Sequence, residues 1–288
     1  MESFDSTFVA APPLDADLTD TRDVRAHRPM PQFCNPAREP ARFRPLKALY
    51  HFRQLLKDKE NTEEVFRIFE ALPYKGFVPA ARAFMESEKG RAIFDSEEFL
   101  PDILDDHAAL RRTPAGSVAH AYCDFMEAEG LTAAGLVAES LKTRGNRPPF
   151  DDQIEWYGFR QRDTHDLLHV LTGYGRDALG EQCVLAFTYG QSPSLGNVFI
   201  AYAGGLNMKS RMNKAGIGKG VPVIAAITEG KRLGKACPKV SEMAIRDLLA
   251  MPLEEARAKF GIARPVQYHK AHEMLRAQGC DPYNLLAA

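Results

Sequence analysis

The stretch NTEEVFRIFEAL, residues 61–72, carries the pattern that decides the fold. Its apolar side chains recur at i, i+3, i+4 and i+7, as they do on one face of an α-helix: Val65, Ile68, Phe69 and Leu72. Asn61 or Thr62 can cap the start of this helix, and the two glutamates that follow favour its first turn. The stretch therefore predicts an amphipathic helix.

The same periodicity recurs along most of the chain. We expect further helices over residues 46–58, 79–93, 96–111, 115–128, 132–143, 153–172, 181–190, 221–235, 241–250 and 253–260. Glycines and prolines separate these segments, and neither an alternating strand pattern of useful length nor a repeat of fixed period is present. The sequence therefore predicts an all-α fold, with a single multi-helix domain over residues 46–280.

Residues 1–45 differ from the rest of the chain in composition. They contain seven prolines, and the first 24 residues hold six acidic side chains against one arginine. Because periodic apolar positions are scarce, we expect an extended, Pro-rich acidic N-terminal arm. Both a flexible tail and a partner-binding arm agree with this composition.

Charge, cysteine content and hydropathy narrow the class of protein. The 37 Lys and Arg balance 38 Asp and Glu, which gives no reason to expect nucleic-acid binding. The five cysteines form no CxxC pair, so we expect a reducing compartment and no cysteine-based metal site. No apolar run reaches the roughly 18 residues of a membrane span, and no targeting peptide is recognisable. We expect a cytoplasmic bacterial protein that can still touch a membrane surface.

The stretch DTHDLLH, residues 163–169, is the first candidate for chemistry. On a helix, His165, Asp166 and His169 fall in one sector, while the two leucines point into packing. Histidines at i and i+4 can grip one metal ion, as in the HExxH zinc motif, and the short Asp166 side chain suits a ligand better than a reaching general base. Coincidental spacing of two histidines remains open.

Glu181 follows His169 after eleven residues that contain three glycines. One helix can therefore end near Gly173 and a second can begin near Gly180, so that Glu181 packs back toward the histidines. Two imidazoles and two carboxylates suit zinc, with iron or manganese as alternatives. Four protein ligands are typical of a closed structural zinc, so catalysis would need an open position or a ligand that is released.

The pattern HDxxH followed by eleven residues and Glu resembles the signature of the ubiquinone-biosynthesis family called coenzyme Q protein four. The resemblance extends to FRQRDTHDLLHVLTGYGRDALGE (159–181), TPAGSVAHAYCDFM (113–126) and MPLEEARAKFGI (251–262), and covers about residues 42–265. Gln161 departs from the pattern, where an aromatic residue is expected, and the N-terminal arm has no counterpart.

The resemblance implies an all-helical protein, peripheral on the inner membrane of a bacterium, that works with other ubiquinone-biosynthesis proteins. It implies decarboxylation, or oxidative decarboxylation, at ring carbon one of a 4-hydroxy-3-methoxy-5-polyprenylbenzoate. It also implies a zinc ion bound by His165, Asp166, His169 and Glu181, where zinc would act as a Lewis acid. A homodimer is a further expected association.

Arg160 and Arg162 match two arginines of the family pattern and are the candidate catalytic residues. They could neutralise the substrate carboxylate or phenolate. Alternatively they are solvated, or they pair with Asp163 and Glu155.

A polyprenyl tail needs an apolar groove, and the candidates for its lining are Val184, Leu185, Phe187, Val198, Phe199, Ile200 and Tyr202. Between Leu206 and Lys239, eight Lys or Arg accompany one acidic residue, which favours an anionic membrane face. Asp105-Asp106-His107 and His269-Lys270-Ala271-His272 are weaker metal candidates and are better explained as exposed helix residues. Two other functions stay open: a non-catalytic lipid-binding organiser of the pathway enzymes, and a metal-dependent phosphohydrolase.

Overall fold

The computed structural model describes residues 30–58, 61–97, 99–145 and 147–285. Within them all regular structure is helical, apart from one isolated bridge between Ser117 and Pro252. The predicted all-α class is confirmed. Most of the predicted N-terminal arm, residues 1–29, lies outside the described residues. The chain divides into two units at Pro31–Gln32, and the helices described below belong to the second.

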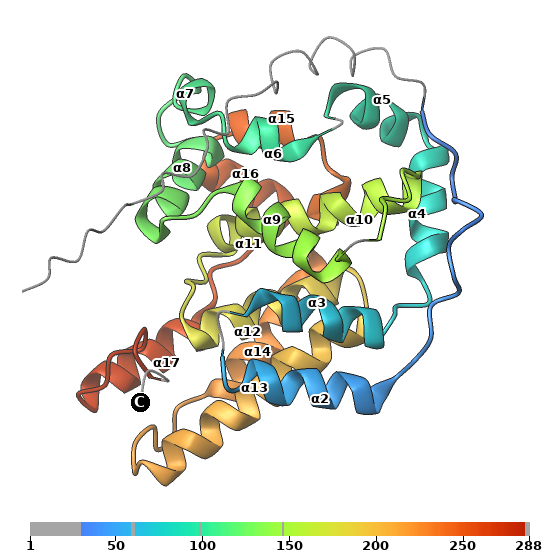
Figure 1. Cartoon of the computed structure of the whole chain (residues 1–288). Coiled ribbons are helices and arrows are strands. Elements are labelled where there is room, and N and C mark those ends of the chain that lie inside the picture. Colours follow the sequence, from blue (N-terminus) through green and yellow to red (C-terminus); the bar gives the residue numbers. More distant parts are fainter. Residues whose placement is uncertain (1–29, 59–60, 98, 146, 286–288) are drawn as a thin grey trace, which may run out of the picture. The chain divides into compact units, whose positions relative to one another are not determined.

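The helices follow one another along the chain in the order seen in Figure 1. Their bounds are α2 (Pro45–Leu55), α3 (Thr62–Ala71), α4 (Phe77–Glu86), α5 (Glu88–Ser96), α6 (Leu100–Leu104), α7 (His107–Leu110), α8 (Val118–Glu129), α9 (Ala133–Arg144), α10 (Gln153–Asp163), α11 (His165–Thr172), α12 (Ala178–Gln191), α13 (Leu195–Lys214), α14 (Val223–Ala236), the 3-10 helix η1 (Val240–Glu242), α15 (Ile245–Ala250), α16 (Leu253–Phe260) and α17 (Val266–Ala277).

Four expected helices are each divided into two, namely 79–93, 96–111 (α6 and α7), 153–172 and 241–250 (η1 and α15), and a hydroxyl residue marks the break in two of them. Residues 79–93 break at Ser87, which has extended backbone angles and whose hydroxyl accepts a hydrogen bond from the amide of Gly90, so that it caps α5. Residues 153–172 break at Thr164, between α10 and α11. In both places a hydroxyl residue offers the backbone an alternative partner, which apolar periodicity does not register.

The long helix α13 was not among the expected helices, because its two consecutive glycines, Gly204 and Gly205, are typical of a turn. Both glycines instead allow close packing. A Cβ at Gly205 would lie 2.3 Å from Cδ1 of Ile227, and one at Gly204 would lie 2.5 Å from Oε1 of Gln182. Small residues here let α13 approach its neighbours, and packing supports a helix that propensity alone would break.

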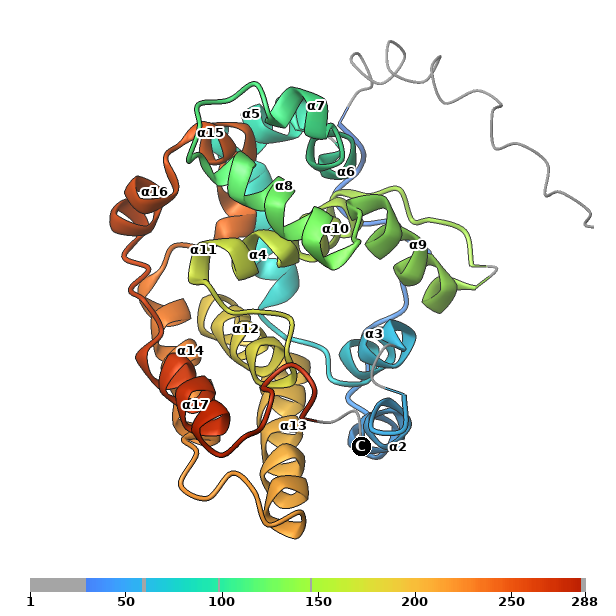
Figure 2. The same ribbon diagram turned by 90° about the vertical axis from the view of Figure 1, so that its left-hand side faces the viewer.

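The helix α12 lies between α13 and α14 and packs against both (Figures 1 and 2). Its approach to α14 is unusually close at glycines. A Cβ at Gly234 would lie 2.0 Å from the carbonyl oxygen of Phe187, and one at Gly190 would lie 2.4 Å from that of Lys231. The two backbones therefore touch, and α12 and α14 form a closely packed pair.

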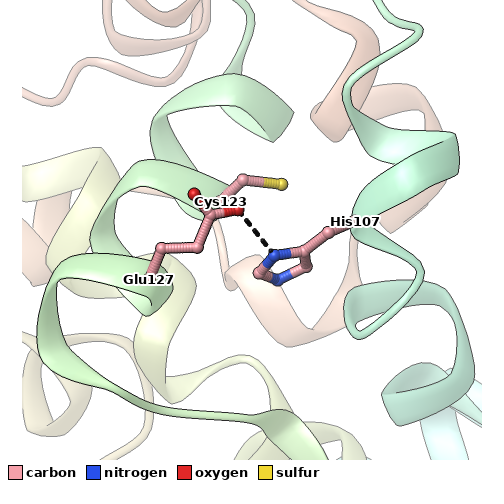
Figure 3. Close-up of side chains that lie close together, drawn as sticks. All are labelled: His107, Cys123 and Glu127. Carbon is pink, nitrogen blue, oxygen red and sulfur yellow. Dashed lines mark hydrogen bonds and ion pairs between the residues drawn. The ribbon is translucent and has the colours of Figure 1, made fainter.

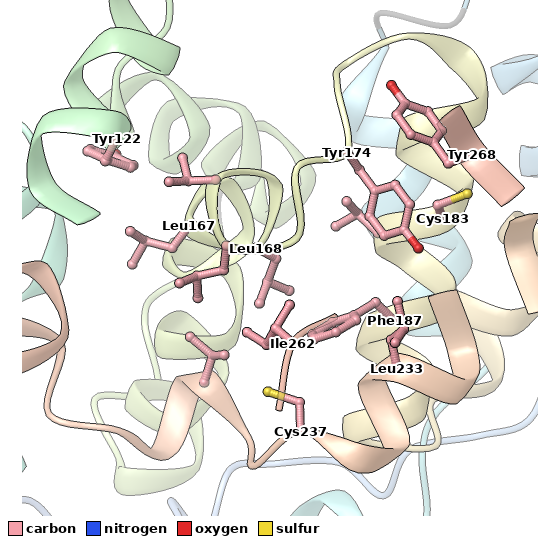
Figure 4. Close-up of a cluster of buried hydrophobic side chains, with 14 of the residues drawn as sticks. Tyr122, Leu167, Leu168, Tyr174, Cys183, Phe187, Leu233, Cys237, Ile262 and Tyr268 are labelled. Atoms are coloured by element: carbon pink, nitrogen blue, oxygen red, sulfur yellow. The ribbon is translucent and has the colours of Figure 1, made fainter. Parts of the chain in front are cut away.

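The main hydrophobic core surrounds α11 and α12 (Figure 4). It contains Leu167 and Leu168, the two residues between the histidines of DTHDLLH, as the helical period predicted. A smaller core joins α2 and α3 to Ile200 of α13. Leu185 of α12 packs against both cores. No helix among the described residues is long and apolar enough to cross a membrane.

Candidate metal centre

Three local signals place the predicted ligands. The helix α11 begins at His165 and ends at Gly173, whose φ of 75° is readily adopted only by glycine and whose amide donates to the carbonyl of His169. Asp177 then caps α12, because its carboxylate accepts from the amides of Leu179 and Gly180. Glu181 consequently stands in the first turn of α12, facing the end of α11.

The ligand atoms converge. Oε2 of Glu181 lies 3.6 Å from Nε2 of His165 and 3.6 Å from Nε2 of His169. Ligand atoms of His165, Asp166 and His169 all lie within 4.8 Å of one another. The fold thus brings Asp166 and Glu181 each close to both histidines, at separations that a small contraction around a cation would close.

The hydrogen bond of the His169 ring shows which of its two nitrogens is available to bind a metal ion. Its Nδ1 lies 3.0 Å from the carbonyl oxygen of Tyr174, which can only accept, so Nδ1 carries the proton. Nε2 is then the nitrogen left to face Glu181, and this buried atom makes no hydrogen bond. A positive charge, either a proton on Nε2 or a cation between Nε2 and the carboxylate, is stabilised at this place. A histidine that donates its other N–H to a backbone carbonyl is typical of metal sites.

The electrostatics of the pair agree with a cation-attracting centre. Burial alone would lower the pKa of His169, but the Glu181 carboxylate offsets this and raises the pKa above its ordinary value of 6.5. Burial would raise the pKa of Glu181, whereas His169 and His165 lower it below its ordinary value. Glu181 is therefore held as the carboxylate, the form that binds a metal.

The centre has a closed side and an open side. The His169 side chain is fully buried, and its ring stacks on Phe125 of α8 with centroids 5.3 Å apart. His165 and Glu181 keep 28% and 30% of their side-chain surface exposed. These two and Asp166 line a cavity of about 1880 Å³. Although four residues converge, the centre is thus accessible from the cavity.

Walls of the cavity come from both cores. Residues of α2 and α3 line one side, and residues of α10 to α13 line the other. Of the apolar residues expected to line a groove, Leu185 and Ile200 do so, whereas Val184 and Phe187 are fully buried in the main core. Phe199 packs against Phe52 of α2.

The two predicted catalytic arginines have different surroundings. Arg160 is 2% exposed and donates to the carbonyls of Ser241 and Met243 and to the carboxylate of Glu97. It is not among the residues that line the cavity. Its contacts are those of an anchor between α10 and the chain around η1, so they favour a structural role; a role in substrate binding stays a prediction.

Arg162 does line the cavity. Its Nε donates to Oδ1 of Asp163 at 2.6 Å, and its Nη1 donates to the hydroxyl of Ser140 at 2.8 Å. The pairing of Arg162 with Asp163 is the alternative that the sequence left open. Nη2 of Arg162 is buried and without a hydrogen-bond partner.

Arg176 is a cavity residue that sequence reasoning missed. Its Nε lies 3.6 Å from Oε1 of Glu181, and its Nη1 lies 3.9 Å from Oε2 of Glu129. Both separations are longer than a hydrogen bond, so this guanidinium can turn toward an anion beside the centre. Its place in the glycine-rich turn just before the cap Asp177 is the signal that could have found it.

Comparisons with known protein sequences point to one protein family. The family described as "Coenzyme Q (ubiquinone) biosynthesis protein Coq4" matches residues 58–266, a range that contains the whole centre. Ubiquinone biosynthesis protein COQ4 homologs 2 and 1, mitochondrial, of Culex quinquefasciatus are each 27% identical over 103 residues, or 36% of this chain. The aligned part spans 43% and 36% of those proteins, less than half of each.

A solved structure adds to the fold comparison. The crystal structure of a protein of Nostoc punctiforme PCC 73102, named for ubiquinone biosynthesis, superimposes with a TM-score of 0.54. It covers 77% of this chain and 99% of its own, at 24% sequence identity. At this identity the likeness supports the fold alone.

Proposed function

The chain belongs to the coenzyme Q (ubiquinone) biosynthesis protein Coq4 family, and from this membership we propose that it removes the carboxyl group at ring carbon one of a polyprenylated hydroxybenzoate. The substrate class is a 4-hydroxy-3-methoxy-5-polyprenylbenzoate. In the simple reaction the ring-to-carboxyl bond breaks, carbon dioxide leaves and ring carbon one takes a proton. In the oxidative form, the carboxyl again leaves as carbon dioxide and a hydroxyl from water takes its place, while dioxygen accepts the two electrons and two protons and becomes hydrogen peroxide.

The single observation that carries the proposal is the unpartnered Nε2 of His169, facing the Glu181 carboxylate beside a large cavity. His165, Asp166, His169 and Glu181 would hold a divalent metal, with zinc proposed first and iron or manganese as alternatives. Once bound, zinc would supply Lewis-acid stabilisation of negative charge on a substrate oxygen. The stacking on Phe125 and the hydrogen bond to the Tyr174 carbonyl would hold the His169 ring in place before a ligand arrives.

Arginines of the cavity would recognise the substrate anion. We assign Arg176 to the carboxylate or phenolate, because its two ion pairs are long and it stands beside Glu181. Arg162 would contribute from α10, although its contacts with Asp163 and Ser140 hold it more firmly. Positioning the carboxylate and excluding water are what these residues can do for bond cleavage.

The cavity is large enough for a tail as well as a ring. Its volume of about 1880 Å³ exceeds the roughly 300–1,000 Å³ of a pocket for a drug-sized ligand. Apolar side chains from both walls line it, among them Phe69, Leu185 and Ile200. A polyprenyl chain between the α2–α3 wall and the α13 wall would cover these side chains.

A lipid substrate requires access to a bilayer, and we propose a peripheral contact with an anionic membrane. On α2, Leu46 and Tyr50 expose 81% and 57% of their surface, one turn apart on the same face. Leu206, where the basic stretch of α13 begins, is 58% exposed. Apolar anchors near lysines and arginines are typical of interfacial helices. Flotation with anionic vesicles tests this, and Leu46→Glu should weaken the association.

The decisive experiment supplies a short-chain 4-hydroxy-3-methoxy-5-prenylbenzoate to the pure, zinc-loaded protein and follows the product by mass spectrometry. Loss of the carboxyl is expected, and the product mass distinguishes hydrogen from hydroxyl at ring carbon one. His169→Ala should lose both the metal and the turnover. Lys270→Ala on α17 provides a control, because Lys270 does not line the cavity.

Other outcomes would favour the other functions. Full zinc occupancy without turnover, together with loss of other pathway enzymes from the membrane in the His169→Ala strain, would replace catalysis by the organiser role. Phosphatase activity with manganese would support the phosphohydrolase. The fourth group at the centre is Glu181 rather than the distant His and Asp which that chemistry needs.

A further inference from the structure

A second cluster of metal-ligating side chains lies on α7 and α8 (Figure 3). One ligand atom each from His107, Cys123 and Glu127 lies within 4.8 Å of the others. Nδ1 of His107 is 3.0 Å from Oε1 of Glu127. Cys123 and Glu127 are one turn apart on α8, so both side chains project toward the His107 ring.

This cluster is separate from the centre on α11 and α12. On α8, Phe125 is two residues from both Cys123 and Glu127, which on a helix is about 160–200° around the axis. Phe125 stacks on His169, so one side of α8 supports the first centre while the opposite side carries the second cluster. Occupation of one does not require occupation of the other.

We propose that His107, Cys123 and Glu127 form a second binding site, for a zinc-like divalent cation, with one sulfur, one nitrogen and one oxygen ligand. Thiolate and imidazole together favour zinc over magnesium or calcium, which take oxygen ligands. The three protein ligands leave a fourth tetrahedral position for water. On binding, the Cys123 thiol gives up its proton to solvent, and the proton of His107 moves from Nδ1 to Nε2.

The charges around the cluster are compatible with a cation. Arg111 is the nearest opposing charge, and it pairs with Asp124 at 2.6 Å and with Oε2 of Glu127 at 2.9 Å. Oε1, the other oxygen of Glu127, is the one that faces His107. The guanidinium is therefore balanced by Asp124 and orients the Glu127 carboxylate without occupying the oxygen that the cation needs.

The exposure of the three side chains also suits a cation-binding site. Cys123 is fully buried, whereas Glu127 keeps 55% and His107 keeps 26% of its side-chain surface exposed. The sulfur is therefore the inner ligand, and the exposed His107 and Glu127 side chains are the ones that a cation would meet first. Once bound, it would fasten the four-residue helix α7 to α8.

The sequence had suggested that no cysteine takes part in a metal site, because no two cysteines have ligand spacing. The site needs only one cysteine, and His107 and Cys123 are brought together by the packing of α7 on α8. The neighbours of His107 in Asp105-Asp106-His107 are used otherwise. Asp106 caps α7, and Asp105 accepts from the amides of Ala133 and Ala134.

Cobalt titration tests this site separately from the first. The full-length protein, stripped of metal, is titrated with Co²⁺ and followed by absorption. Only a thiolate ligand gives a strong near-ultraviolet charge-transfer band, since the centre at His169 offers nitrogen and oxygen alone. The band should appear in the wild type and vanish in Cys123→Ser. Cys34→Ser, which removes an exposed cysteine, should keep it.

Two milder variants protect the test against misfolding. His107→Ala and Glu127→Gln alter partly exposed side chains. Each should lower the Co²⁺ affinity of the site, measured from the band, by more than the roughly 10–100-fold typical of an outer-shell partner. Absence of the band in the wild type at saturating Co²⁺ would overturn the proposal. So would its persistence in Cys123→Ser. Neither result would bear on the decarboxylase proposal, which depends on the other centre.

Discussion

Arg160 and His169 lie on the consecutive helices α10 and α11 and are almost equally buried, at 2% and 1% exposure, yet their surroundings are opposite. The charge of Arg160 meets a carboxylate and two carbonyls. Nε2 of His169 faces the Glu181 carboxylate at 3.6 Å and makes no hydrogen bond. Burial is therefore a poor guide to function, and so is a single unsatisfied atom, because Nη1 of Arg160 also lacks a partner. What distinguishes His169 is that other ligand atoms converge on it beside a cavity.

The largest expected effect comes from removing the Arg160 guanidinium, which donates to Glu97 and to two carbonyls. Arg160→Met leaves Glu97 buried without its cation and two carbonyls without a donor. The free energy of unfolding should fall by about 3–5 kcal/mol, measured by urea denaturation of the metal-free protein. Zinc affinity of the folded fraction should stay unchanged. Arg160→Lys keeps the charge and should cost less, and a large loss of zinc affinity in either variant would contradict the assignment.

Glu181→Gln changes the surroundings of His169, the second residue of this comparison. It removes the carboxylate that faces both histidines while keeping the side-chain shape. Zinc affinity should drop at least about 100-fold, which corresponds to about 2.7 kcal/mol. The stability of the metal-free protein should change by less than in Arg160→Met. Competition with a chromogenic chelator measures the affinity, and Glu129→Gln, which alters the other ion pair of Arg176, is the matched control.

Asp152 is a buried charge whose contribution to stability depends on pH. It caps α10 and is 2% exposed; burial would raise its pKa, but Arg38 and the amides of Asn35 and Glu155 lower it below 3.8. A lowered pKa means that the stabilisation is complete above pH 3.8 and is lost as the pH falls through the folded-state value.

Asp152→Asn should therefore cost about 1–2 kcal/mol at neutral pH. The cost should shrink as the pH falls below 3.8, where wild type and variant converge. Denaturation series at several pH values measure this. A difference that stays constant down to pH 2 would show that Arg38 does not act through the Asp152 charge.

Tyr268→Phe is the smallest expected perturbation. The Tyr268 hydroxyl donates to Oδ2 of Asp177 and accepts from the amide of Gly175, so it braces the cap of α12. Its loss should cost about 0.5–1.5 kcal/mol. Because Asp177 orients the turn that carries Glu181, zinc affinity should fall by less than about tenfold. Equal zinc affinities in wild type and variant would show that Tyr268 contributes to stability only.

The positions of the four candidate ligands could be predicted because they depend on the local sequence. The period of 3.6 residues placed His165, Asp166 and His169 on one face, and Gly173 ended the helix where a left-handed residue was needed. Glu181 then needed only a short turn and a capped restart. All four residues lie within two helices and one loop, so little depended on the rest of the fold.

What the sequence missed depends on distant packing. Whether an arginine on α10 faces the cavity or the interior is decided by its contacts with Glu97 and the chain around η1, which are far away in sequence. The same reason hid His107 beside Cys123. In α13, two glycines look like a turn until Ile227 and Gln182 are known to press on them. The family resemblance supplied the role in ubiquinone biosynthesis, which residue spacing alone left open.

The backbone contact between α12 and α14 has a mechanical consequence. With Gly234 against the Phe187 carbonyl, the wall that carries Glu181 cannot slide or tilt without a clash. The opposite wall, α2 and α3, rests on a core of few side chains. Entry and exit of a bulky molecule must therefore be accommodated by breathing of α2 and α3, whose amide hydrogens should exchange faster than those of α12. The candidate metal ligands and the more loosely packed wall thus lie on opposite sides of one cavity.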